Sequence, residues 1–219
     1  MAELDQELSL TAMSLPGHRG LNRPRHAKVN GGTFVMKDKP VGSGPNNPWD
    51  PKPIHSAEHA VLTASLQEQR DHVVGILEGL SETELHRPIL PSGWTCLGLV
   101  NHLTFDVERF WFRGVIAGEP AVTAELERRR TESWNVVLDA SSHDVLRRYR
   151  HEAALATTII GHTPTETAPV WWPDATFGSW RLNSLREVLL HVTTETACHA
   201  GHLDAARELL DGRTWRVHD

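Results

Sequence analysis

The sequence predicts an all-α protein, a four-helix bundle with a long crossover between its second and third helices. Apolar residues recur at spacings of three, four and seven in four long segments, which is the period of a helix with one buried face. Ser or Thr precedes these segments and Gly follows several of them, as is usual at helix ends. No segment shows the alternation of a strand. Residues 119–140 separate the second segment from the third and form the crossover.

The first three long helices are expected within a domain that spans residues 54–219. Ser56, Thr95 and Ser141 stand where N-caps are expected. Ser81, with a glutamate three residues later, makes a capping box and predicts a short helical turn. The long helices are expected at about 56–79, about 95–114 or 95–118, and about 141–161.

Residues 1–53 differ in composition from the rest of the chain. Seven of the thirteen prolines fall here, together with glycine-rich breaks in any periodicity. Such a segment buries too little apolar surface to offset its ordering entropy, so a flexible tail is expected.

Composition excludes several classes of protein. Lys plus Arg is 22 and Asp plus Glu is 28, a net charge of −6, which argues against a nucleic-acid surface and an anionic membrane partner. No apolar run approaches the roughly 18 residues of a membrane span, and the N-terminus lacks the apolar core of a signal peptide. Cys96 and Cys198 lie inside expected helices and form no disulfide pattern. A reducing, cytoplasmic location is therefore expected.

The last helix, Asn183–Gly212, has both ends marked and one buried stripe. Ser184 followed by Glu187 is a capping box, and Gly212 stands just past the last turn. The apolar stripe is formed by Leu185, Leu189, Val192, Thr196, Leu203, Ala206 and Leu210.

A polar group lies beside this stripe. At about 100° per residue, His191, Glu195, His199 and His202 fall within roughly 80° of one another. A carboxylate and an imidazole four residues apart on a helix can bind one cation, and Glu195 and His199 have that spacing. His191 and Glu195 have the same spacing of four residues. His191 and His202 are about 16 Å apart along the axis, so all four cannot share one ion and a ligand from another helix is expected.

His102, on the second long helix, is the candidate for that ligand. It stands among apolar residues, one turn before Asp106. It is either a core histidine bonded to a backbone carbonyl or the missing metal ligand. The tryptophan-rich loop 162–180 has two interpretations as well. Its residues Trp171, Trp172 and Trp180 either wall a pocket near the last helix or cover the end of the bundle.

Two segments carry a family resemblance over residues from about 56 to 215. They are ILEGLSETELHRPILPSGWTCLGLVNHLTFDVERFWF and LREVLLHVTTETACHAGHLDAARELLDG. The chain resembles the DinB-like superfamily, in particular its actinobacterial branch of uncharacterised proteins. Superfamily members commonly bind a divalent metal through a histidine of helix two and two ligands four apart on the last helix. The resemblance therefore implies His102, Glu195 and His199 as metal ligands.

Glu195 departs from the His-x-x-x-His pattern of many relatives. It matches the Glu-x-x-x-His pattern of the mycothiol-dependent maleylpyruvate isomerase type, whose metal is zinc. Zn²⁺ is therefore expected, although the ligand set also tolerates Ni²⁺, Fe²⁺ or Mn²⁺. The implied activity is a metal-dependent enzyme that activates a low-molecular-weight thiol, mycothiol in actinobacteria, for S-transfer or isomerisation. The implied partners are the thiol and an electrophile, and dimerisation is compatible with the superfamily.

Two other functions are compatible with the same ligands. Two histidines and one carboxylate also form the facial triad of non-haem Fe(II) oxygenases. Alternatively, the metal only holds the second long helix against the last one, and the protein is a non-catalytic binding module. His202 is a candidate catalytic residue, as general base or as a hydrogen-bond partner of metal-bound water, or it is a further ligand. The same site roles are possible for His191, and for both histidines a purely structural role is the alternative.

Overall fold

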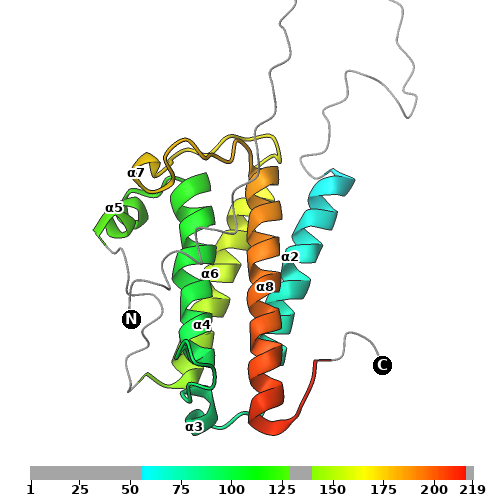
Figure 1. Ribbon diagram of the computed structural model, residues 1–219. Helices are drawn as coiled ribbons and strands as arrows, with labels where there is room; N and C mark the ends of the chain where they lie inside the picture. The colour runs from blue at the N-terminus through cyan, green and yellow to red at the C-terminus, as the bar shows by residue number, and fades with distance from the viewer. Residues whose placement is uncertain (1–55, 129–139, 216–219) are drawn as a thin grey trace, which may run out of the picture. The chain divides into compact units, whose positions relative to one another are not determined.

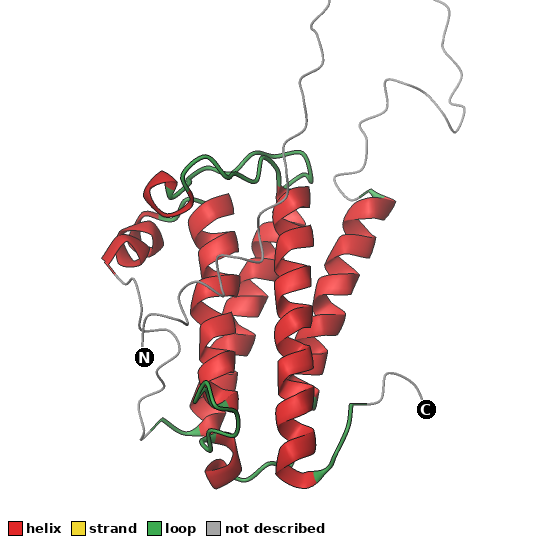
Figure 2. Cartoon of the chain, viewed as in Figure 1, coloured by secondary structure: helices red, strands yellow, loops and turns green. Residues whose placement is uncertain are grey.

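The computed structural model describes residues 56–128 and 140–215. Every regular element in these two ranges is helical and neither range contains a strand, so the predicted all-α class is confirmed (Figure 2). The flexible tail expected at residues 1–53 lies outside the described residues, as does the expected domain boundary at residue 54. None of the described helices is long and apolar enough to cross a membrane.

Four long helical segments lie side by side in this part of the chain (Figure 1). They are α2 (Ala57–Gly75), the continuous pair α4 (Cys96–His102) and η1 (Leu103–Ile116), α6 (Ser142–His162) and α8 (Leu185–Asp211). Contacts join α2 to α8, η1 to both α6 and α8, and α4 to α6. Three short helices lie near the ends of the long ones: α3 (Glu82–Leu85), α5 (Pro120–Arg128) and α7 (Asp174–Phe177).

The second long segment changes its hydrogen-bonding pattern at His102. From Leu103 to Ile116 it is a π-helix, in which backbone amides bond to carbonyls five residues back. The bond from Ala117 N to Phe112 O, at 2.9 Å, belongs to this pattern. Local π-helical turns occur frequently at functional sites, and this stretch begins directly after His102.

Side-chain caps mark the starts of the four long helical segments and of α3, as the sequence predicts. Each capping oxygen accepts a hydrogen bond from a backbone N–H of the first turn, which contributes about 1 kcal/mol. The caps are Ser56 on α2, Ser81 on α3, Thr95 on α4, Ser141 on α6 and Ser184 on α8. The box at α3 is reciprocal, because Ser81 N donates to the Glu84 carboxylate at 2.8 Å. At α8 the Glu187 carboxylate accepts from Asn183 N, one residue before the cap.

One helix boundary and the content of the crossover differ from the prediction. Helix α2 ends at Gly75 instead of Gly79, and residues 76–79 form turns. The reason is a distant side chain: Arg207 of α8 donates to Ile76 O at 2.8 Å and to Glu78 O at 2.9 Å, so carbonyls at this helix end have a partner outside the helix. The predicted crossover contains the helix α5, whose first residue is a proline, a usual start signal that the prediction overlooked.

The buried face of α8 is the predicted one. Six residues of the predicted stripe are buried, and Leu210 is partly buried against the same core. This face packs with residues of the other long segments such as Leu66, Leu103 and Ile160, each 0% exposed. Burial of one leucine side chain contributes roughly 2 kcal/mol, so this core holds α8 in place.

A buried ion pair also crosses the core. Arg70 of α2 donates to both carboxylate oxygens of Glu108 of η1, at 2.7 and 2.6 Å. The same guanidinium donates to Thr157 of α6 at 2.9 Å. Arg70 is 3% exposed and Glu108 is 0% exposed. The pair therefore joins three of the four long segments inside the core.

Candidate metal centre

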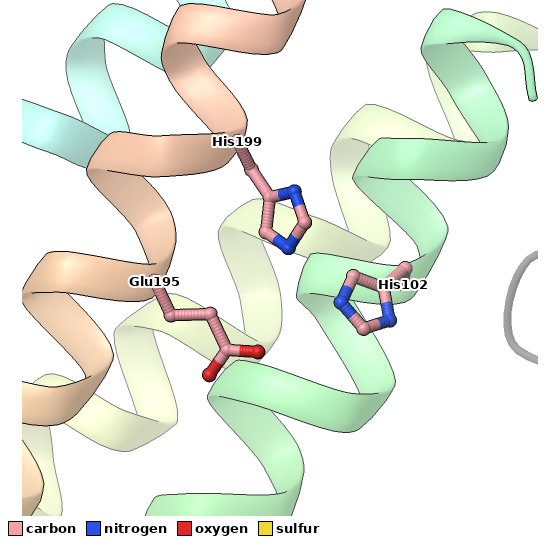
Figure 3. A group of neighbouring side chains, drawn as sticks. All are labelled: His102, Glu195 and His199. Atoms are coloured by element: carbon pink, nitrogen blue, oxygen red, sulfur yellow. The ribbon is translucent and has the colours of Figure 1, made fainter. Parts of the chain in front are cut away.

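The structure brings His102, Glu195 and His199 together. His102 is the last residue of α4, while Glu195 and His199 face the same side of α8 because they are four residues apart. Among the described residues these three form a group in which one ligand atom of each lies within 4.8 Å of the others. Figure 3 shows the two imidazoles and the carboxylate pointing toward one another from two helices.

The His102 imidazole is buried and held by a carboxylate on the next turn. The residue is 6% exposed. Its Nδ1 lies 2.8 Å from Asp106 Oδ2, and because a carboxylate only accepts, Nδ1 is the donor. Nε2 is then the nitrogen that can act as a ligand. Such carboxylate–histidine pairs fix the tautomer and orientation of metal-binding histidines. The geometry therefore favours the ligand interpretation over that of an ordinary core histidine.

His199 is held in the neutral form. Burial lowers its pKa to about 4, and the neighbouring His102 acts in the same direction while the Glu195 carboxylate opposes it. The rings of His102 and His199 meet edge to face with centroids 5.0 Å apart. Because metals bind the neutral imidazole, His199 presents the binding form at neutral pH.

The two other polar residues of α8 lie beside this group. His191 Nε2 is 3.2 Å from Glu195 Oε2, and its side chain is 11% exposed. His202 is exposed, with its ring 5.6 Å from that of His199 and 6.2 Å from that of Trp94. Neither belongs to the group of three close donors found in the described part of the chain. His191 thus contacts one candidate ligand, and His202 lies at the solvent side of another.

An aromatic cluster adjoins the site on the His191 side. It consists of Trp111, Trp172, Phe177 and Trp180, whose rings contact one another. Trp111 and Trp172 are 3% and 6% exposed. The loop that carries three of these residues is tied to η1, because Val170 N and Trp171 N both donate to Val115 O. Trp172 is buried and the other aromatic rings of the loop are partly buried against the core, which favours the interpretation of the loop as a cover. The apolar spacing of the second long helix predicts Trp111 as a core residue, which its burial confirms, but nothing in that spacing indicates its contact with this loop.

The donor atoms fit a divalent transition metal. Two imidazole nitrogens and a carboxylate oxygen are the three protein ligands of many catalytic zinc sites. In this protein, Asp106 orients the His102 ring, and burial keeps the His199 ring neutral. A protonated imidazole cannot bind a cation, so the neutral form of His199 suits a metal ligand.

The all-helical fold of the described residues is consistent with the DinB-like class of proteins. Within that class, the family model described as mycothiol-S-transferase matches residues 61–212, and the chain belongs to this family. The match covers every long helical segment, α2 only from its second turn, and all three close donors. No curated protein and no solved structure matches the chain.

Proposed function

We propose that the protein is a divalent-metal-dependent mycothiol S-transferase built on a DinB-like four-helix bundle. The observation that carries this proposal is the meeting of His102, Glu195 and His199 with ligand atoms within 4.8 Å of one another. The family match supplies the thiol and the class of reaction. We assign the four long segments to the bundle and residues 119–140 to its long crossover.

The three clustered residues would hold the metal, with Zn²⁺ as the first choice. When bound, the cation favours the deprotonated form of a thiol that reaches it. Asp106 keeps the His102 ring oriented, and burial keeps His199 neutral. The site that these residues form therefore suits the anionic sulfur of a thiolate.

His202 is assigned to proton transfer. Its ring is exposed and lies 5.6 Å from that of His199, where solvent and an incoming thiol have access. The imidazole accepts the proton of the thiol and passes it to solvent. The sulfur then forms a bond to an electrophilic carbon, and the leaving group departs with the electron pair of the bond that breaks. In an addition reaction, the proton returns to the product instead.

The proposed substrates are mycothiol and an electrophile of small size, with no nucleic-acid or membrane partner. The cytoplasm is the proposed location, because a thiol substrate needs a reducing compartment. A homodimer is compatible with this function.

The test is conjugation of mycothiol to a fluorogenic electrophilic dye by the zinc-loaded protein. Turnover is expected to depend on the metal and to fall by at least about 100-fold in His199→Ala. His151→Ala is the matched control, because His151 is an exposed histidine on α6, and it should keep wild-type activity. Wild-type turnover no higher than that of His199→Ala would refute the proposal. Stoichiometric iron with dioxygen consumption would assign the site to the oxygenases instead.

A further inference from the structure

The Glu195 carboxylate lies near the two other candidate ligands and is also in contact with His191. Figure 3 shows it turned toward the imidazoles of His102 and His199. His191, one helical turn earlier on α8, has its Nε2 atom 3.2 Å from Glu195 Oε2. The Glu195 carboxylate is therefore in contact with His191 and also belongs to the group of three donors.

His191 is itself confined by two aromatic rings. Its imidazole meets Trp111 of η1 edge to face, with centroids 4.6 Å apart and an interplanar angle of 71°. It also meets Trp180, from the loop before α8, at 5.7 Å and 61°. The two indole rings contact each other at 6.1 Å. Only 11% of the His191 side chain is exposed, so its position is set by tertiary packing.

The arrangement parallels the one around His102. There, Asp106 on the following turn of the same helical segment holds the ring through a contact of 2.8 Å. Partners of this kind orient metal ligands, and their loss typically lowers metal affinity 10-fold to 100-fold. Two of the three candidate ligands thus have a polar partner at a distance of four residues.

We propose that His191 is a positioning residue that fixes the Glu195 carboxylate for metal binding. The contact of its Nε2 atom with Oε2, at 3.2 Å, holds the carboxylate turned toward the ligand atoms of His102 and His199. Trp111 and Trp180 hold the His191 ring in place. The aromatic cluster therefore sets the orientation of the Glu195 carboxylate. This inference rests on the proposed metal centre.

Two substitutions separate positioning from packing. His191→Phe keeps an aromatic ring against Trp111 and Trp180 but removes the N–H group. His191→Gln supplies an amide N–H to Glu195 but removes the ring. The readouts are the Zn²⁺ dissociation constant, measured by competition with a chelator, and the visible absorption spectrum of the Co²⁺-loaded protein. The melting temperature of the metal-free protein reports on packing alone.

A positioning role predicts a defined pattern. His191→Phe should bind Zn²⁺ about 10-fold to 100-fold more weakly and show a changed Co²⁺ spectrum, while its metal-free melting temperature stays within a few degrees of wild type. His191→Gln should recover much of the affinity even where it melts lower. Wild-type affinity and spectrum in His191→Phe would overturn the inference and leave the metal centre intact. Equal loss in both variants would overturn it too, in favour of packing. A wild-type protein that takes up neither cation would refute the metal centre itself.

Discussion

Replacing Arg70 by leucine removes the partner of a carboxylate that has no contact with solvent. Glu108 is 0% exposed, and its two oxygens accept hydrogen bonds from Arg70 at 2.7 and 2.6 Å. The substitution also removes the 2.9 Å bond from Arg70 to Thr157. Loss of one partner of a buried ion pair costs about 3 to 5 kcal/mol, because the remaining charge stays in surroundings of low dielectric constant.

The double variant Arg70→Leu/Glu108→Leu should be the more stable of the two. It removes both charges and leaves apolar side chains in an apolar core, a change that is often nearly neutral. We expect a loss of about 4 kcal/mol in the unfolding free energy of Arg70→Leu and of about 1 kcal/mol in the double variant. The second substitution thus restores about 3 kcal/mol.

The measurement is urea unfolding of the metal-free proteins at pH 7, followed by circular dichroism. Arg147→Leu is the matched control, because Arg147 lies on α6 in an ion pair with Asp144 at 3.3 Å in which both side chains are more than half exposed. Such surface pairs contribute about 0 to 1 kcal/mol. If Arg70→Leu lost no more stability than this control, or if the double variant were less stable than the single one, the reasoning would be wrong.

Three further predictions concern the site and the two cysteines. His102→Ala should weaken Zn²⁺ binding at least about 100-fold in a calorimetric titration, and unchanged binding would show that α4 supplies no ligand. Because the pKa of His199 is lowered to about 4, the unfolded chain binds a proton before the folded one does as the pH falls. The metal-free protein should therefore lose about 2 kcal/mol of unfolding free energy between pH 7 and pH 5 through this residue. Urea unfolding should show a smaller loss in His199→Gln, and an equal loss would contradict the assignment. Burial raises the pKa of the Cys96 thiol to about 11, whereas Cys198 is exposed. At pH 8 a disulfide reagent should therefore modify one thiol per folded chain quickly and the second only in denaturant, and Cys198→Ser should abolish the fast phase.

The starts of the helices and the buried face of α8 could be predicted because they depend on neighbours in the chain. A serine or threonine side chain accepts a hydrogen bond from an amide two or three residues later, as Ser56 does from His59 N at 3.1 Å. The pairing of Glu195 with His199 is local as well, since the helical repeat places residues four apart on one face. The end of α2 was predicted too late, because Arg207, far along the chain, binds the carbonyls of Ile76 and Glu78.

By itself, the sequence determined the class of fold, the start of each long helix and the two candidate ligands on α8, all of which follow from short-range hydrogen bonds and periodicity. The family resemblance implied His102 as their partner, but only the packing of α4 and η1 against α8 brings His102 close to those residues and makes Trp111 confine His191. The ion pair of Arg70 and Glu108 depends on the same packing. Contacts between distant segments form where apolar faces of several helices are buried together, and their partners cannot be deduced from the order of residues along one helix.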